Sequence, residues 1–260
     1  MSSATHAGAG ARITAITSGK GGVGKTFVSA NLAAALARQG QRVLVLDADL
    51  GLANLDVVLN LYPKLTLHDV FTGKTTLDDA ILPAPGGFSV LLAGSGMIEY
   101  SRLTPAVRDL LHDVVVRVRP RFDHVLLDTG AGISDVVLYT VSLADEIVIV
   151  ATPEPTSLTD AYATIKVLAA NQARRSIRLL VNQSQRAGEA RAIRNQLQLV
   201  VDRYVNTTLD EPLTIELLGD VPLDTSVREA VLRRELLLDA WPGSAAAQAL
   251  VAAGARLLGA

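Results

Sequence analysis

Short runs of β-branched and aliphatic residues alternate with longer amphipathic stretches along the chain. The short runs are almost entirely apolar, which is typical of strands buried on both faces. They are Ile13–Thr17, Arg42–Leu46, Phe88–Leu92, His124–Leu127, Glu146–Ala151 and Ile177–Val181. The helical patterns between them include Phe27–Arg38, Pro105–Val118, Leu158–Ala173 and Glu189–Tyr204. This alternation predicts an α/β fold, a doubly wound and mostly parallel sheet with helices on both faces.

Neither a repeat of fixed period nor a Pro- or Ser-rich linker divides the chain, so we expect a flexible N-terminus over residues 1–11 and one domain over 12–260. With 260 residues, 49% of them hydrophobic, the chain can bury a sizeable core. No apolar stretch reaches the roughly 18 residues that a membrane-spanning helix needs. We expect a cytoplasmic protein, and recruitment to the inner membrane or the cell pole in a ligand-bound state is left open.

The chain has no cysteine, which excludes disulfides, thiolate metal sites, cysteine-ligated iron–sulfur clusters and a thiol nucleophile. The net charge of −2 conceals an uneven distribution. Residues 161–204 carry eight basic and two acidic residues, a net charge of +6, so the rest of the chain sums to −8. Such a segment is typical of a solvated helix face, but it also fits a docking surface for an acidic partner, anionic lipid or DNA.

The most specific motif is the run from Gly19 to Thr26, which fits G-x-x-x-x-G-K-[ST] between a predicted strand and a predicted helix. Its glycines let backbone N–H groups converge on phosphate oxygens, and the helix N-terminus adds positive potential. Lys25 would neutralise phosphate charge, and the Thr26 hydroxyl would bind Mg²⁺. The predicted nucleotide contacts in this loop are Gly19, Lys20, Gly21, Gly22, Val23, Gly24, Lys25, Thr26 and Phe27.

Lys20 is a second lysine inside the phosphate loop. It is either simply exposed or reaches a phosphate of its own site or of a facing subunit. In the second case it would act like an arginine finger, stabilising charge on the transferred phosphoryl group.

Two predicted strands run into carboxylates: Asp47 and Asp49 follow one, and Asp128 follows the other. Ligands of parallel sheets bind beyond the carboxyl ends of the strands, so these acids should face the phosphate loop. Asp128 fits the Walker B acid that holds Mg²⁺ through a water molecule, and Asp47 fits a carboxylate that supports the magnesium from behind its direct ligands. Asp49 lies further out, where it would orient the attacking water.

Asn182 ends another predicted strand, and its amide can both donate to and accept from a purine edge. The guanine-reading pattern Asn-Lys-x-Asp is absent, because residues 182–185 read Asn-Gln-Ser-Gln, so adenine is favoured. The alternative is that Asn182 only fixes the strand–loop junction. The turn at residues 221–224, with Pro222, is a candidate wall for the base.

The phosphate loop with Lys20, together with Asp47 and Asp49, resembles the deviant Walker A family of MinD/ParA ATPases over about residues 12–240. The stretch from Asp49 to Asp56 is MinD-like. The stretches at residues 67–70, 128–134 and 152–162 are similar to the FlhG/FleN group, the MinD-like regulators of flagellar number and placement.

This resemblance implies an ATP-dependent homodimer that sandwiches two ATP molecules, in which Lys20 of each subunit contacts the other's nucleotide. ATP/ADP and Mg²⁺ would be the cofactors, and Asn54 and Gly130–Gly132 would lie in switch segments. Hydrolysis would be slow, because the output is a conformational state. The implied partners are a polar flagellar GTPase, C-ring or rotor proteins, or a flagellar transcription activator.

Two features depart from the group. Residues 1–11 lack the Asp-Gln-Ala-containing helix that stimulates the polar GTPase in many members. The helical pattern from Ala245 to Leu258 has one basic residue and few bulky apolar ones, which favours a packed helix over a membrane-targeting one. A MinD-type septum-site ATPase and a ParA-type DNA-partition ATPase remain the alternatives, and DNA binding is the less favoured.

Overall fold

The computed structural model describes residues 10–51, 53–94, 100 and 102–259. Those residues form one eight-stranded sheet with the order β3-β4-β2-β5-β1-β6-β7-β8. Its strands are β1 (Arg12–Ser18), β2 (Val43–Ala48), β3 (Ile81–Pro83), β4 (Ser89–Leu91), β5 (His124–Ala131), β6 (Glu146–Ala151), β7 (Ser176–Ser184) and β8 (Thr214–Pro222). All neighbouring pairs are parallel except β3 with β4. The predicted mostly parallel sheet is confirmed.

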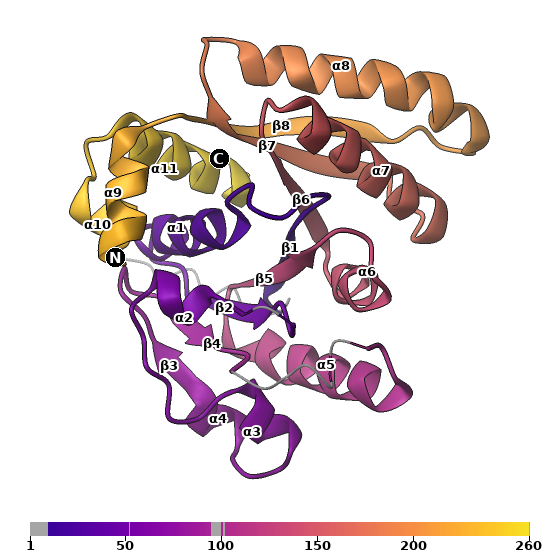
Figure 1. The fold of residues 1–260 in the computed structure, drawn as a ribbon. Coiled ribbons are helices and arrows are strands. Elements are labelled where there is room, and N and C mark those ends of the chain that lie inside the picture. Colours follow the sequence, from indigo (N-terminus) through magenta and orange to yellow (C-terminus); the bar gives the residue numbers. More distant parts are fainter. Residues whose placement is uncertain (1–9, 52, 95–99, 101, 260) are drawn as a thin grey trace, which may run out of the picture.

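Helices cover both faces of the sheet (Figure 1). Their bounds are α1 (Lys25–Ala37), α2 (Leu55–Val58), α3 (Leu67–Phe71), α4 (Leu77–Ala80), α5 (Pro105–Val118), α6 (Asp135–Ser142), α7 (Pro155–Asn171), α8 (Glu189–Tyr204), α9 (Thr225–Arg233), α10 (Leu237–Ala240) and α11 (Ala245–Leu258), with short 3-10 turns η2 (Arg119–Arg121) and η3 (Asn206–Thr208). One buried cluster joins the sheet to α5, α6, α7 and α8. The other joins it to α1, α10 and α11.

Most predicted elements lie within a few residues of those observed. The structure adds β8, which the sequence pattern did not predict because Glu216 and Gly219 interrupt its apolar run, and a register irregularity opposes Leu180 to that glycine. Ala11 is buried, and its N–H donates to the Arg119 carbonyl at 2.7 Å, so ordered structure begins before Arg12. The rest of the expected flexible N-terminus, residues 1–9, lies outside the described residues.

Helix α11 packs directly on α1, the helix that follows the phosphate loop. A Cβ added to Gly254 would lie 2.9 Å from the Ala35 Cβ, so the glycine permits the close approach of the two helices. Ala246, Leu250 and Leu257 are fully buried. This is the packed terminal helix that the sequence favoured, and no helix among the described residues is long and apolar enough to cross a bilayer.

The amino ends of the strands hold α11 by charge as well. Arg12 donates to the Leu257 carbonyl at 3.2 Å, and Arg178 donates to the Arg256 carbonyl at 3.2 Å. Cations at a helix C-terminus satisfy carbonyls that have no partner within the helix. The last turn of α11 is therefore fixed to the edge of the sheet opposite the phosphate loop.

Candidate functional site

The phosphate loop joins β1 to α1 and needs glycine at several points. Gly22 and Gly24 have φ values of 79° and 94°, a region that side chains disfavour. A Cβ on Gly24 would also lie 2.5 Å from Asn182 Nδ2, and one on Gly19 would overlap the Asp160 backbone. A Cβ on Gly21 would have no atom within 4 Å, so the backbone at this position is open toward a ligand.

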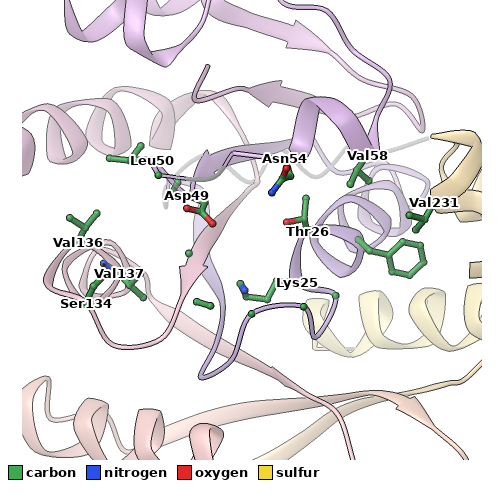
Figure 2. Close-up of a pocket in the computed structure, with 18 residues that line it drawn as sticks. Lys25, Thr26, Asp49, Leu50, Asn54, Val58, Ser134, Val136, Val137 and Val231 are labelled. Carbon is green, nitrogen blue, oxygen red and sulfur yellow. Dashed lines mark hydrogen bonds between the residues drawn. The ribbon is translucent and has the colours of Figure 1, made fainter. Parts of the chain in front are cut away.

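A cavity of about 630 Å³ lies in front of this loop. Figure 2 shows Lys25, Thr26 and Asp49 pointing into the same space, with Asn54 beside it. The cavity is lined by Gly21, Gly22, Gly24, Lys25, Thr26, Phe27, Ala48, Asp49, Leu50, Gly51, Asn54, Val58, Gly130, Ala131, Ser134, Val136, Val137 and Val231. Elements far apart in the sequence thus converge on the loop that the motif predicted.

Asp47 and Asp128 lie side by side on the neighbouring strands β2 and β5, directly opposite in register. Burial raises the pKa of Asp128 to about 6, against the hydrogen bonds that it accepts from Thr26 and Ser29. Burial, and then the charge of Asp128, raise the pKa of Asp47 well above its usual value. Two buried carboxylates on neighbouring strands are costly without a cation between them or nearby.

Lys25 is the nearest buried cation. Burial lowers its pKa, while the charges of Asp128 and Asp49 act in the opposite direction. An ammonium surrounded by backbone dipoles and facing the cavity is suited to pair with phosphate. The lysine alone does not balance the acids, so the site favours a further positive group.

Asp49 lies beyond the end of β2 and its N–H donates to Asp47 Oδ1 at 3.3 Å. A Cβ on Gly130 would lie 3.3 Å from Asp49 Oδ1, so the last residues of β5, where the next loop begins, pass close to this carboxylate. Gly132 continues that loop and donates to the Ser18 carbonyl at 2.8 Å. The Gly130–Gly132 segment, one of the two expected to report nucleotide state, therefore lies next to Asp49 and to Ser18, the residue just before the phosphate loop.

Lys20 is turned toward the start of α7 in the single chain. Its Nζ lies 3.0 Å from both Glu154 Oε2 and Thr156 Oγ1. Lys20 is partly exposed and Glu154 is largely exposed, so this ion pair is weak and Lys20 can exchange Glu154 for another anion. Lys20 does not line the cavity of its own chain.

Asn182 and Pro222 stand apart from the cavity lining. Asn182 is buried, its Nδ2 donates to the Val23 carbonyl at 2.8 Å, and its Oδ1 accepts from the Gln183 N–H at 3.0 Å. Asn182 therefore fixes the strand–loop junction and supports the phosphate loop from behind. Each amide atom retains one hydrogen-bonding position, so contact with a purine stays a prediction.

The donor set suits a hard divalent cation bound with a nucleotide. Asp47 Oδ2 is buried and has no hydrogen-bond partner among the described residues. The described chain holds no group of three or more His, Cys, Asp or Glu side chains that would bind a metal by themselves. Mg²⁺ is usually held by a hydroxyl, one or two carboxylates, phosphate oxygens and water, and Thr26, Asp47 and Asp128 offer the hydroxyl and the carboxylates of such a set.

Residues 10–257 match the family ParA, described as NUBPL iron-transfer P-loop NTPase. The chain belongs to the ParA family of P-loop NTPases. It is 42% identical over 241 residues to the antiactivator FleN of Pseudomonas aeruginosa, covering 93% of this chain and 84% of that protein. It is 32% identical to the flagellum site-determining protein YlxH of Helicobacter pylori, covering 92% and 79%.

Among solved structures, the ParA-family chain is similar to the septum site-determining protein MinD of Pyrococcus horikoshii complexed with Mg-ADP. The TM-score is 0.77 at 29% identity, over 95% of this chain and 96% of that one. The expected resemblance to MinD-like proteins and to the FlhG/FleN group is confirmed. Because this ParA-family chain has no cysteine, it lacks the thiolates that usually bind an iron–sulfur cluster.

Three features of the ParA-family site were not evident in the sequence. Val58 and Val231 lie on the same side of the cavity and make that side apolar (Figure 2), and Phe27 also lines the cavity. Glu154 lay in a stretch noted only for its resemblance, and nothing in the sequence paired it with Lys20. Ser29 donates to Asp128. The one feature of the sequence that could have indicated this is that Ser29 is a polar residue in a mostly apolar helical run.

Proposed function

We propose that this chain is an Mg²⁺-dependent ATPase that dimerises when ATP is bound and regulates the number or placement of flagella. The observation that carries the proposal is the 42% identity with FleN over 93% of the chain. The similarity to YlxH, named for determining the flagellum site, supports the same process. The charged cavity at the phosphate loop supports the nucleotide chemistry.

In this proposal the backbone N–H groups of the phosphate loop and the Lys25 ammonium bind the phosphates of ATP. Thr26, Asp47 and Asp128 hold the metal, which when bound neutralises charge on the phosphate oxygens. Asp49 orients a water molecule toward the γ-phosphorus. The water oxygen bonds to that phosphorus while the bond from phosphorus to the bridging oxygen breaks, and the water proton passes to phosphate or solvent as ADP and phosphate are released.

The position of Lys20 supports the dimer in this proposal. Because Lys20 faces Glu154 and Thr156 rather than its own cavity, its ammonium is available to a phosphate supplied across a subunit interface. A cation added from a second subunit stabilises charge on the transferred phosphoryl group. Hydrolysis would then be slow in the monomer, and the dimer would be the signalling state.

The test of the dimer compares wild type with Asp49→Ala by light scattering after gel filtration. We expect the wild type to be monomeric with ADP and to dimerise transiently with ATP and Mg²⁺. Asp49→Ala should bind ATP, fail to hydrolyse it and remain dimeric. An Asp49→Ala protein that is monomeric with ATP would contradict the assigned role.

The test of the biological role is deletion of the gene, followed by counting flagella and recording their positions. A changed count or position that is restored by wild type but not by Asp49→Ala supports the proposal. Unchanged flagella together with misplaced septa would support instead a MinD-type role, which the similarity to Pyrococcus horikoshii MinD favours. The partners expected from the resemblance are a polar GTPase, C-ring proteins or a transcription activator.

The structure favours DNA partition less. Arg174 donates to the carbonyls of Val141, Ser142 and Ala144. Arg178 is paired with Glu146 at 3.2 Å and with Glu216 at 3.6 Å. Two arginines of the basic segment are therefore engaged within the fold, and fewer positive charges remain for phosphate groups of DNA.

A further inference from the structure

Asp128 is held by two hydroxyl groups of helix α1. It hydrogen-bonds the side chain of Thr26, the last residue of the phosphate-loop motif. Its Oδ1 also accepts a hydrogen bond of 2.9 Å from Ser29 Oγ. Residues three apart on a helix project from the same face, so both hydroxyls meet the carboxylate at the end of β5.

Ser29 and Asp128 are both enclosed in protein. Ser29 is 0% exposed and Asp128 is 2% exposed. Ser29 lies one turn deeper in α1 than Thr26 and does not line the cavity. It has no direct access to a ligand, so any effect that it has on the site passes through Asp128.

The partner of Ser29 is unusual for a buried hydroxyl in a helix. Such side chains commonly donate to the carbonyl four residues earlier. In this chain Thr140 does so to Val136 and Thr164 to Asp160, each at 2.9 Å. Ser29 instead donates to the Asp128 carboxylate on strand β5. Its hydroxyl therefore does not make the hydrogen bond to a carbonyl of its own helix.

The hydrogen bond from Ser29 matters because the Asp128 carboxylate could otherwise rotate into other orientations. Asp47 lies opposite it on β2, and the positive charge of Lys25 acts on it from the start of α1. A carboxylate fixed at one oxygen presents its second oxygen in one direction. The Thr26 hydroxyl can bind the cation through an oxygen lone pair while its O–H donates to Asp128, so Ser29 supplies a second attachment that does not touch the cation.

We propose that Ser29 is a positioning residue, which holds the Asp128 carboxylate in the orientation that a nucleotide-bound divalent cation requires. The inference rests on the proposed function and deepens it by adding a residue outside the phosphate-loop motif. Groups that orient metal ligands commonly change metal affinity by about 10- to 100-fold when they are removed.

The experiment measures ADP binding by the full chain while Mg²⁺ is titrated, with EDTA as the metal-free condition. We expect Ser29→Ala to need about tenfold more Mg²⁺ for half-maximal enhancement of ADP affinity, and to bind ADP in EDTA like wild type. Ser29→Thr keeps the hydroxyl and should restore the wild-type midpoint. Mn²⁺, followed by its electron paramagnetic resonance signal, should show the same weakening without any turnover.

Thr164→Val is the matched control, because it removes a buried helical hydroxyl that donates only within its own helix. It should leave the Mg²⁺ midpoint unchanged. If Ser29→Ala does not fold, Ser29→Cys retains the size of the side chain with a much weaker donor and should show an intermediate shift.

An unchanged Mg²⁺ midpoint in a folded Ser29→Ala or Ser29→Cys protein would overturn the inference. So would an equal loss of ADP affinity with and without Mg²⁺, since that result indicates packing alone. A wild-type chain whose ADP affinity does not depend on Mg²⁺ would overturn the metal part of the proposed function and this inference with it. The wild-type titration therefore separates the two failures before any variant is compared.

Discussion

Charged residues lie at both edges of the sheet. At the amino edge they are paired with each other or with backbone carbonyls, whereas at the carboxyl edge two buried acids lie side by side. At the amino edge five residues interlock, which we call the amino-edge cluster: Arg12, Glu146, Arg178, Glu216 and Arg256. Each of them has an opposite charge or a backbone carbonyl as partner. At the carboxyl edge Asp47 and Asp128 lie on neighbouring strands and are both buried. Burial raises the pKa of each carboxyl group.

The charges at the amino edge therefore stabilise the fold, whereas those at the carboxyl edge are suited to binding a ligand. Paired groups at a sheet edge lower the cost of burying them and fix α11. Unbalanced acids beside a lysine and a glycine-rich loop raise the free energy of the unliganded chain. Strained electrostatics of this kind is expected where binding repays the cost.

The largest effect should come from Lys20→Ala, a change at the carboxyl edge. If Lys20 acts across the dimer, ATP turnover should fall by about 10³-fold, as for an arginine finger, while nucleotide binding is largely retained. Phosphate release and ADP binding measure the two quantities. Its melting temperature should stay near wild type, because the Lys20–Glu154 pair is exposed.

Glu154→Gln is the matched partner of that variant. It removes the intramolecular anion and keeps Lys20, so we expect turnover to persist and dimerisation with ATP to be no weaker. A Lys20→Ala protein with wild-type turnover would break the comparison, because a carboxyl-edge charge would then serve neither fold nor chemistry.

The second effect belongs to the amino edge. Arg178→Met removes the better partner of Glu146, whose Oε2 is already buried without a hydrogen bond among the described residues. Because both side chains are mostly buried, we expect unfolding in urea to require about 2–3 kcal/mol less. ATP turnover at a temperature where the variant is folded should match wild type, and a loss of turnover there would contradict the division of roles.

The third effect is a pH dependence of the unliganded chain. The pKa of Asp128 is about 6 in the fold, above its ordinary value, so the folded state binds a proton more tightly than the unfolded state. Stability should therefore rise as the pH falls from about 7 to about 5. Asp128→Asn should raise the melting temperature near neutral pH and flatten this dependence, while abolishing Mg²⁺-dependent turnover.

The smallest effect tests an exception. Asp224 lies at the carboxyl edge, yet its two oxygens accept from the N–H groups of Ser226 and Ala246, at the starts of α9 and α11. Burial acts against it, but these hydrogen bonds hold its pKa below the usual value. Asp224→Ala should cost about 1–2 kcal/mol near neutral pH, and the difference from wild type should shrink on acidification as the carboxylate protonates.

The sequence predicted the parts of the fold that local pattern controls. Glu146–Ala151 and Pro105–Val118 are observed with the predicted bounds, because long periodic runs bounded by turns leave few alternatives. β8 was missed because its edge position tolerates Glu216 and its register irregularity accommodates Gly219. Patterns at sheet edges are weaker because one neighbour is missing.

The site was predicted to the extent that motifs define it. Lys25, Thr26 and Asp49 do line one cavity. Contacts between side chains from different elements were not predictable, since nothing in the spacing indicates that Ser29 faces Asp128 or that Lys20 meets Glu154. Asn182 shows the same limit, because its amide is used by the Val23 carbonyl, a partner that only the folded loop brings near.

The position of β1 in the middle of the sheet has a consequence for synthesis. β1 carries the phosphate loop, and it pairs on its two sides with β5 and β6, which start at His124 and Glu146. From Arg12 to His124 is 124 − 12 = 112 residues, which a ribosome adds in roughly 6–22 s at about 5–20 residues per second. During that interval the strand has no native neighbour, so the nascent chain must be kept from aggregating before it can bind its first nucleotide.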